Sequence, residues 1–94
     1  MTFDPAKRKS NLQKHQIDLA ECEAVFDEPM LTREDGREDG RESYGEQRLV
    51  SLACFRGEVV VLVWADRDDG PRLISCRKAE TYERQTYSKA FPQI

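Results

Sequence analysis

Polar and basic side chains recur at helical spacing near the start of this 94-residue chain. The recurring residues are Lys7, Asn11, Lys14 and His15. They follow the i, i+4, i+7, i+8 pattern, so they share one face of a helix. A cationic face rich in hydrogen-bond donors suits contact with backbone phosphates. The alternative is an ordinary solvated face, whose basic residues lie near the helix C-terminus because the helix dipole favours them there.

His15 is the only histidine of the chain. An imidazole group has an ordinary pKa close to neutral, so it could act as a general base. The residue also stands at a predicted corner, because Gln16 and Ile17 separate one helix from the next. There the ring would close the first helix against the second. We interpret His15 as structural and keep catalysis as the alternative.

A second group of basic residues lies at or near the ends of predicted strands. Its members are Arg48, Arg67, Arg72, Arg77 and Lys78. Alternation along the strand over residues 72–77 puts Arg72 and Arg77 on opposite faces. Arg77 could pair with Glu83 and so dock the last helix. Otherwise the arginines surround an anionic ligand, which guanidinium groups bind through two parallel hydrogen bonds.

Caps, turns and apolar periodicity predict a single α+β domain over residues 1–94. Asp4 and Asp18 are signals for helix starts, and Ala6 and Leu12 are expected to be buried. The predicted helices cover Pro5–His15, Asp18–Pro29 and Ala79–Phe91, and the predicted strands cover Gln47–Phe55, Glu58–Ala65 and Arg72–Arg77. These elements would form a small antiparallel sheet packed against two N-terminal helices and one C-terminal helix.

Residues 33–42 form a charged tandem repeat, REDGREDGRE. Its three arginines and five acidic residues account for −2 of the net charge of −3. The rest of the chain is nearly neutral, so the net charge does not exclude RNA as a partner. The repeat cannot bury enough surface to offset the entropy of ordering it. We therefore expect a mobile loop over residues 33–45.

Several kinds of functional site have no signal in the sequence. It contains no Gly-rich phosphate loop, no Ser-His-Asp order and no metal-ligand spacing, so we expect neither a metal nor a cofactor. Cys22, Cys54 and Cys76 form no CxxC pair and lie in apolar surroundings, which indicates reduced core residues. The longest apolar run, VVVLVWA at 59–65, is too short to span a membrane. We expect no membrane contact and a cytoplasmic location.

Four blocks of sequence, in order along the chain, are similar to the blocks of a known family. They are FDPAKRKSNLQKHQIDL at 3–19, EAVFDEP at 23–29, GEQRLVSL at 45–52 and RLISCRKAETYERQTY at 72–87. The first resembles the F-D-x-x-K…N-x-x-K-H opening of the BrnT toxin family. The last resembles the R-I-I-S-A-R-x-A-x-x-x-E-R-x-x-Y ending of the same family. The resemblance covers nearly the whole chain apart from the charged repeat.

The resemblance implies a RelE-like fold and a ribonuclease toxin that arrests translation. It also implies a BrnA-like antitoxin as partner, in a 2:2 heterotetramer. The toxin would contact operator DNA only through this antitoxin. By position, it places catalytic residues at Arg77, Arg48, Arg67, Lys14, His15 and Glu46. We expect Lys7, Arg72 and Lys78, which belong to the two basic groups described above, to bind RNA, and the resemblance covers Lys78 by position.

A ribonuclease that works without a metal must activate a 2′-hydroxyl, stabilise the phosphorane and protonate the leaving 5′-oxygen. Arginine suits the second task. The base would be His15, a carboxylate such as Glu46, or a lysine whose pKa is lowered. A second class of function also remains open: a catalytically weak binding module that acts as a co-repressor with its antitoxin on DNA. Cleavage of RNA by antitoxin-free protein separates the two classes.

Overall fold

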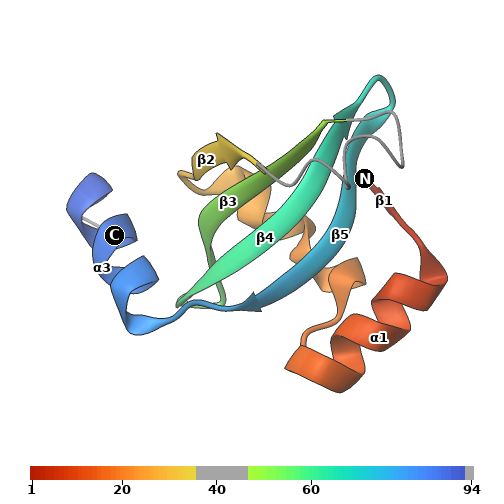
Figure 1. Ribbon diagram of the computed structural model, residues 1–94, viewed down its shortest axis with the longest axis horizontal. Helices are drawn as coiled ribbons and strands as arrows, with labels where there is room; N and C mark the ends of the chain where they lie inside the picture. The colour runs from red at the N-terminus through yellow and green to blue at the C-terminus, as the bar shows by residue number, and fades with distance from the viewer. Residues whose placement is uncertain (36–46, 93–94) are drawn as a thin grey trace.

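The described part of the chain forms a five-stranded sheet with three helices, as the computed structural model shows (Figure 1). The structure describes residues 1–35 and 47–92, so most of the predicted loop lies outside it. The elements are β1 (Thr2–Phe3), α1 (Pro5–His15), the 3₁₀ helix η1 (Leu19–Asp27), β2 (Leu31–Glu34), β3 (Arg48–Phe55), β4 (Glu58–Arg67), β5 (Gly70–Lys78) and α3 (Thr81–Ala90). The prediction of an α+β fold is confirmed.

The strands lie in the order β1-β5-β4-β3-β2 across the sheet. The strands from β2 to β5 pair antiparallel, whereas β1 pairs parallel to β5, with Thr2 beside Arg72. The sheet is therefore mixed, and the prediction of an antiparallel sheet is wrong at this edge. β1 has only two residues, too few to show an alternating pattern. Arg33 and Glu34, which open the predicted loop, belong instead to β2, whose four residues are all exposed and so give no pattern of burial.

The helix η1 covers one face of the sheet (Figure 1). Its residues Leu19, Cys22 and Val25 are fully buried. They belong to one core cluster with the sheet residues Ala53, Val60, Leu62, Leu73 and Cys76. Asp18 caps the helix as predicted and accepts a hydrogen bond from the Ala20 N–H at 3.0 Å. The three buried residues are spaced by three, so the three residues per turn of a 3₁₀ helix align them toward the sheet.

The cysteines are all free thiols. Cys22 and Cys76 are buried in the core, and Cys54 is half-buried on a strand. The hydrogen bond with Cys22 and burial raise the pKa of the Cys76 thiol. That thiol therefore stays protonated and acts as a small core residue.

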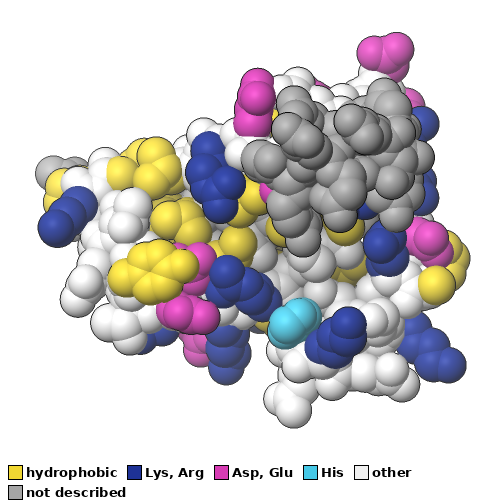
Figure 2. Space-filling view, viewed as in Figure 1, with side chains coloured by type: hydrophobic (Ala, Val, Ile, Leu, Met, Phe, Trp, Pro, Cys, Tyr) yellow, Lys and Arg dark blue, Asp and Glu magenta, His cyan; other side chains and the backbone are white. Residues whose placement is uncertain are grey.

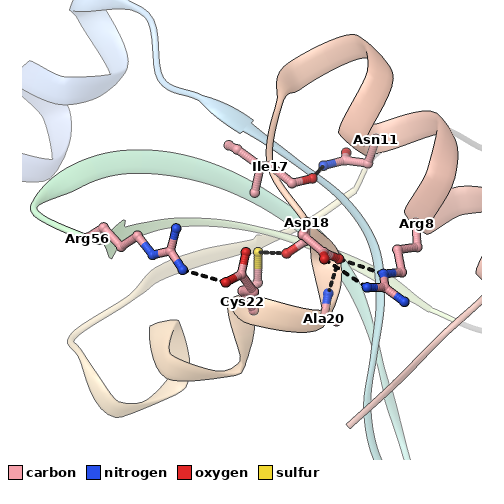
Figure 3. Close-up of polar contacts among 8 residues, drawn as sticks. Arg8, Asn11, Ile17, Asp18, Ala20, Cys22 and Arg56 are labelled. Atoms are coloured by element: carbon pink, nitrogen blue, oxygen red, sulfur yellow. Dashed lines mark hydrogen bonds and ion pairs between the residues drawn. The ribbon is translucent and has the colours of Figure 1, made fainter.

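The side chain of Asn11 fixes α1 along the outer edge of β5. Its Nδ2 donates to the carbonyl oxygens of Ile17 and Cys76, and its Oδ1 accepts from the Cys76 N–H, all at 2.9 Å. Figure 3 shows the amide turned toward the Ile17 carbonyl. Asn11 is 4% exposed, so its predicted place on a phosphate-binding face is wrong. Because this side of α1 faces the sheet, Ala6 and Leu12 are exposed, contrary to prediction.

A second contact joins α1 to η1 (Figure 3). The guanidinium group of Arg8 donates to both carboxylate oxygens of Asp18, at 2.7 and 2.9 Å. The hydrogen bond from Arg8 lowers the pKa of the Asp18 carboxyl, and the Ala20 N–H adds to the effect. On η1 itself, the carboxylate of Glu21 accepts a hydrogen bond from the Arg56 guanidinium group at 2.6 Å.

The side of the sheet opposite η1 carries arginines, and we call it the arginine face. It consists of Arg48, Val50 and Leu52 of β3 and their partners in register, Val61, Val63, Ala65, Arg72, Ser75 and Arg77. The register between β4 and β5 shifts by one residue, because Ser75 pairs with Val63 but Leu73 pairs with Trp64. Ile74 is the extra residue of this β-bulge. The bulge puts Arg72 and Arg77 on the same face, so the prediction of opposite faces is wrong.

Two helices flank the arginine face (Figure 1). α1 lies along β5 at one edge of the sheet, and α3 lies beside β2 and β3 toward the other. The hydroxyl of Tyr87 on α3 donates to the Pro29 carbonyl oxygen at 2.9 Å, just before β2 begins. The first turn of α3 is fixed by Glu83, whose carboxylate accepts from the Glu80 N–H at 2.8 Å.

Candidate active site

A hollow of about 540 Å³ lies between the first half of α1 and the arginine face. Its lining contains four basic residues, Lys7, Arg48, Arg67 and Arg72, together with Asp4, Ala6, Ser10 and Ile74. We call it the basic hollow. All four basic residues belong to the groups that the sequence singled out, and the fold brings them together from the first helix and from three strands that follow much later in the chain.

Strand register gathers the three arginines. Arg48 begins β3 and pairs with Ala65 of β4, which in turn pairs with Arg72 of β5. Arg67 lies two residues beyond Ala65, on the same side of its strand. The three guanidinium groups therefore come from three neighbouring strands at one end of the sheet.

The short strand β1 places Lys7 across from these arginines. Thr2 pairs with Arg72, so the chain enters α1 beside the arginine end of β5. Asp4 then starts the helix, since its carboxylate accepts from the Ala6 N–H at 2.8 Å. Lys7 follows in the first turns of α1 and lines the opposite wall of the hollow.

The charges of the basic hollow favour an anion. Among the described lining residues, four are cationic and only Asp4 carries a carboxylate, which already accepts the helix-capping hydrogen bond. Guanidinium groups present paired donors that match the oxygens of a phosphate. Figure 2 shows that basic side chains are spread over this side of the molecule. The hollow can therefore hold a phosphodiester.

Arg77 is not among the residues that line the hollow. Its guanidinium group donates to both carboxylate oxygens of Glu83, at 2.9 and 3.0 Å. The hydrogen bonds from Arg77 lower the pKa of the Glu83 carboxyl. The structure thus contains the ion pair between Arg77 and the last helix that the sequence offered as one of two alternatives.

Three other predicted site residues are not brought to the hollow by the described structure. Lys78 is exposed and lies 3.6 Å from a carboxylate oxygen of Glu58. Lys14 is exposed on the second half of α1 and does not line the hollow. Glu46 lies outside the described residues.

His15 is the last residue of α1 and is half-buried. The helix ends there because Gln16 adopts the left-handed conformation, with φ of 60°, and donates its N–H to the Leu12 carbonyl oxygen. His15 is not among the lining residues of the basic hollow. Figure 2 shows the histidine at the surface of the same side of the molecule as the basic side chains.

Three polar residues near the hollow were missed from the sequence. Asp4 and Ser10 stand three residues before and after Lys7, and this helical spacing was the signal available for them. Asp35 was assigned to the loop, yet it is 7% exposed and its N–H donates to the Arg48 carbonyl oxygen at 2.8 Å. It sits within a charged repeat, and nothing in that pattern indicates burial.

A family model described as "Ribonuclease toxin, BrnT, of type II toxin-antitoxin system" matches residues 3–83 of the chain. The chain belongs to this family. The match to BrnT spans every lining residue of the basic hollow and extends to Glu83. No curated protein matches the chain significantly.

Membership of the BrnT family assigns the chain to the ribonuclease toxins, and a type II system implies a protein antitoxin as its partner. No helix within residues 1–35 and 47–92 is long and apolar enough to cross a membrane. In the same residues, His, Cys, Asp and Glu side chains form no group of three or more that could hold a metal ion.

Proposed function

We propose that this BrnT-family protein is an endoribonuclease that cleaves RNA in the basic hollow without a metal ion, and that cleavage arrests translation in the cytoplasm. The observation that carries this proposal is the convergence of Lys7, Arg48, Arg67 and Arg72 on one hollow. Ribonuclease activity follows from the family. The hollow adds the position at which a phosphodiester would be held.

In the proposed reaction, the 2′-oxygen attacks the neighbouring phosphorus and the bond from phosphorus to the 5′-oxygen breaks. The products are a 2′,3′-cyclic phosphate and a 5′-hydroxyl. Arg48, Arg67 and Arg72 neutralise the charge that builds up on the phosphorane.

A base accepts the proton of the 2′-hydroxyl and an acid gives one to the 5′-oxygen. Of the candidates for proton transfer, Lys7 lines the hollow, whereas Lys14 and His15 do not and Glu46 lies outside the described residues. Arg77 acts on the site only through α3, because Glu83 occupies its guanidinium group.

Purified protein, freed of its antitoxin, is expected to cleave single-stranded RNA in the presence of EDTA. Arg72→Ala should lower the single-turnover rate by about a hundredfold or more, the scale of a lost electrostatic donor. Lys89→Ala, which changes an exposed cation in the last turn of α3, serves as the matched control. Cleavage that stops in EDTA and returns with Mg²⁺ would refute metal independence. Full activity in Arg72→Ala would refute the assignment of the hollow.

We propose further that the antitoxin is BrnA-like, that the pair forms a 2:2 heterotetramer, and that the toxin reaches operator DNA only through the antitoxin. The cationic side chains of the hollow support this pairing, since an acidic antitoxin segment could cover them. Light scattering of the copurified complex measures the stoichiometry. Binding of operator DNA by the toxin alone would contradict the proposed arrangement. A RelE-like fold belongs to the same proposal and is tested by superposition on RelE-type toxins.

The alternative function is that of a co-repressor without useful catalysis. It predicts intact RNA in the cleavage assay and unchanged operator binding when Arg72 is replaced by alanine. The assay on antitoxin-free protein therefore decides between the two functions.

A further inference from the structure

A second depression lies on the arginine face, between α3 and the strands β2 and β3. Its volume of about 350 Å³ lies at the lower end of the range for small-molecule sites, roughly 300–1,000 Å³. Its lining includes Leu31 and Arg33 of β2, Val50 and Leu52 of β3, and Tyr82, Glu83 and Thr86 of α3. We call it the α3 groove. It shares no lining residue with the basic hollow.

Large apolar side chains are exposed in the α3 groove. Only three large hydrophobic side chains are exposed in the described residues, and two of them line this groove. These two are Leu31, at 38% exposure, and Tyr82, at 63%. Figure 2 shows hydrophobic side chains gathered at the α3 end of this side of the molecule, with basic and acidic side chains beside them. Apolar side chains that are exposed together at one depression make it a candidate binding site.

The α3 groove follows the basic hollow along β3. Arg48 lines the hollow and Val50 lines the groove, and the two side chains lie on the same side of the strand. Their Cα atoms are separated by two residues of strand, about 7 Å. Arg33 pairs in register with Val50 and adds a cation at the groove. A strand of nucleic acid with one phosphate in the hollow therefore has a neighbouring nucleotide at the groove.

The first turn of α3 holds the aromatic wall of the groove in place. Glu83, next to Tyr82, is fixed by Arg77 and by the Glu80 N–H. The Thr86 hydroxyl donates to the Tyr82 carbonyl oxygen at 2.9 Å. The backbone that carries Tyr82 is therefore held in place, and its exposed ring lies at the groove.

We propose that the α3 groove binds one unpaired nucleobase of a single-stranded RNA, stacked on Tyr82, with Arg33 beside a flanking phosphate. The inference rests on the proposed function, because it describes how the RNA cut in the hollow is held. Unpaired bases are recognised by stacking on aromatic side chains. The groove continues from the basic hollow along β3 and has the cation Arg33 in its lining, which favours a nucleotide over an apolar peptide as its occupant.

The test measures binding apart from cleavage. The probe is a short, fluorescently labelled, single-stranded oligonucleotide in which every sugar is 2′-deoxy, so it lacks the attacking hydroxyl. A second probe of the same length has abasic sugars throughout and therefore offers only the backbone. The wild-type protein is expected to bind the first probe about tenfold more tightly than the second, measured by anisotropy at one fixed ionic strength.

Variants then assign this preference to the groove. Tyr82→Ala should abolish most of the tenfold ratio without changing the affinity for the abasic probe, and Tyr82→Phe should retain the ratio. Arg72→Ala should weaken both probes by the same factor, because it acts on the phosphate. Gln85→Ala, which changes an exposed residue of α3 outside the groove, should change neither affinity. Circular dichroism checks that each variant is folded.

Each other outcome overturns a stated part of the account. Equal binding of both probes, or an unchanged ratio in Tyr82→Ala, refutes the base site even if the wild type cleaves RNA. A Tyr82→Ala variant that keeps the ratio but loses affinity for the antitoxin assigns the groove to the protein partner, which also refutes the proposal. Protein that binds neither probe and cleaves no RNA refutes the proposed function and this inference together.

Discussion

The ion pair between Arg77 and Glu83 joins a half-exposed cation to a buried carboxylate. The side chain of Arg77 is 38% exposed, whereas that of Glu83 is 11% exposed. A guanidinium group that loses its partner can turn to water. A carboxylate in the position of Glu83 cannot, so it bears the larger desolvation cost when it is left alone. The two partners therefore contribute unequally to stability.

Arg77→Ala is expected to lower the free energy of unfolding by about 1–3 kcal/mol, the cost of an unsatisfied buried polar group. Glu83→Gln, which keeps an acceptor for the Glu80 N–H, should cost about 1 kcal/mol or less, because the freed cation is solvated. In the Glu83→Gln background, Arg77→Ala should cost about 1 kcal/mol less than in the wild type. Urea denaturation of the four proteins measures this coupling.

Lys78→Ala is the control for that cycle, since its contact with Glu58 is solvent-exposed on both sides. It should change stability by about 0.5 kcal/mol or less. If Arg77→Ala costs the same in both backgrounds, the pair makes no net contribution and the docking role assigned to Arg77 is wrong.

The residues of the basic hollow could be identified from the sequence, but their grouping could not. Arginines at strand ends and a lysine on a capped helix are visible as residue types. Arg72 and Arg77 share a face only because Ile74 is an extra residue in β5. Such a bulge cannot be recognised from the alternation of apolar residues over only six positions. The sequence does not single out Tyr82 for a similar reason, because the exposure of its side chain depends on how α3 packs.

At the scale of elements, α1 is attached to the sheet by a polar side chain. On the outer edge of β5, the short strand β1 pairs only as far as Leu73 and does not reach Cys76. Asn11 supplies both a donor and an acceptor there and so completes the hydrogen bonding of that residue. Since α1 also carries Lys7, this attachment sets one wall of the basic hollow.

Asn11→Ala is expected to lower the free energy of unfolding by about 2–4 kcal/mol, because it leaves buried polar groups of Cys76 and Ile17 unpaired. Gln13→Ala, in an exposed position of the same helix, is the matched control and should have little effect. Chemical denaturation measures both, and hydrogen exchange at the Cys76 amide should accelerate in Asn11→Ala. Stability equal to that of the wild type would show that α1 is held by its other contacts.

The helices and long strands were predictable where a local signal specifies them. Asp4 and Asp18 cap α1 and η1 as expected, and the apolar residues 59–65 form a central strand. The short edge strands were missed because β1 depends on a partner far along the chain and β2 has no buried position. The 3₁₀ form of η1 was missed because spacings of three and four both occur among its apolar residues.

At the scale of the whole molecule, charge is distributed unevenly. The chain carries a net charge of −3, yet in residues 1–35 and 47–92 the lining of one hollow contains four cations and one carboxylate. A local positive potential of this kind attracts a polyanion even when the protein as a whole is acidic. Ionised carboxylates also attach the two flanking helices. Asp18 pairs with Arg8 of α1, and Glu83 of α3 pairs with Arg77.

Acid is therefore expected to loosen both helices. Hydrogen bonds from Arg77 lower the pKa of Glu83, and those from Arg8 lower the pKa of Asp18. A carboxyl group whose pKa is lower in the folded protein binds fewer protons there than in the unfolded chain. Its stabilising effect is complete above the ordinary carboxyl pKa of about 4 and is lost as the pH falls through the lowered value.

The melting temperature should accordingly be level near neutral pH and fall steadily below about pH 5. Glu83→Gln should melt at a lower temperature than the wild type at pH 7, yet lose less on acidification, because one of the two linked groups no longer titrates. The two curves should converge toward low pH, where Glu83 of the wild type is itself protonated and the glutamine resembles it. Parallel curves over the whole range would show that Glu83 is not linked to folding and that acid acts elsewhere in the molecule.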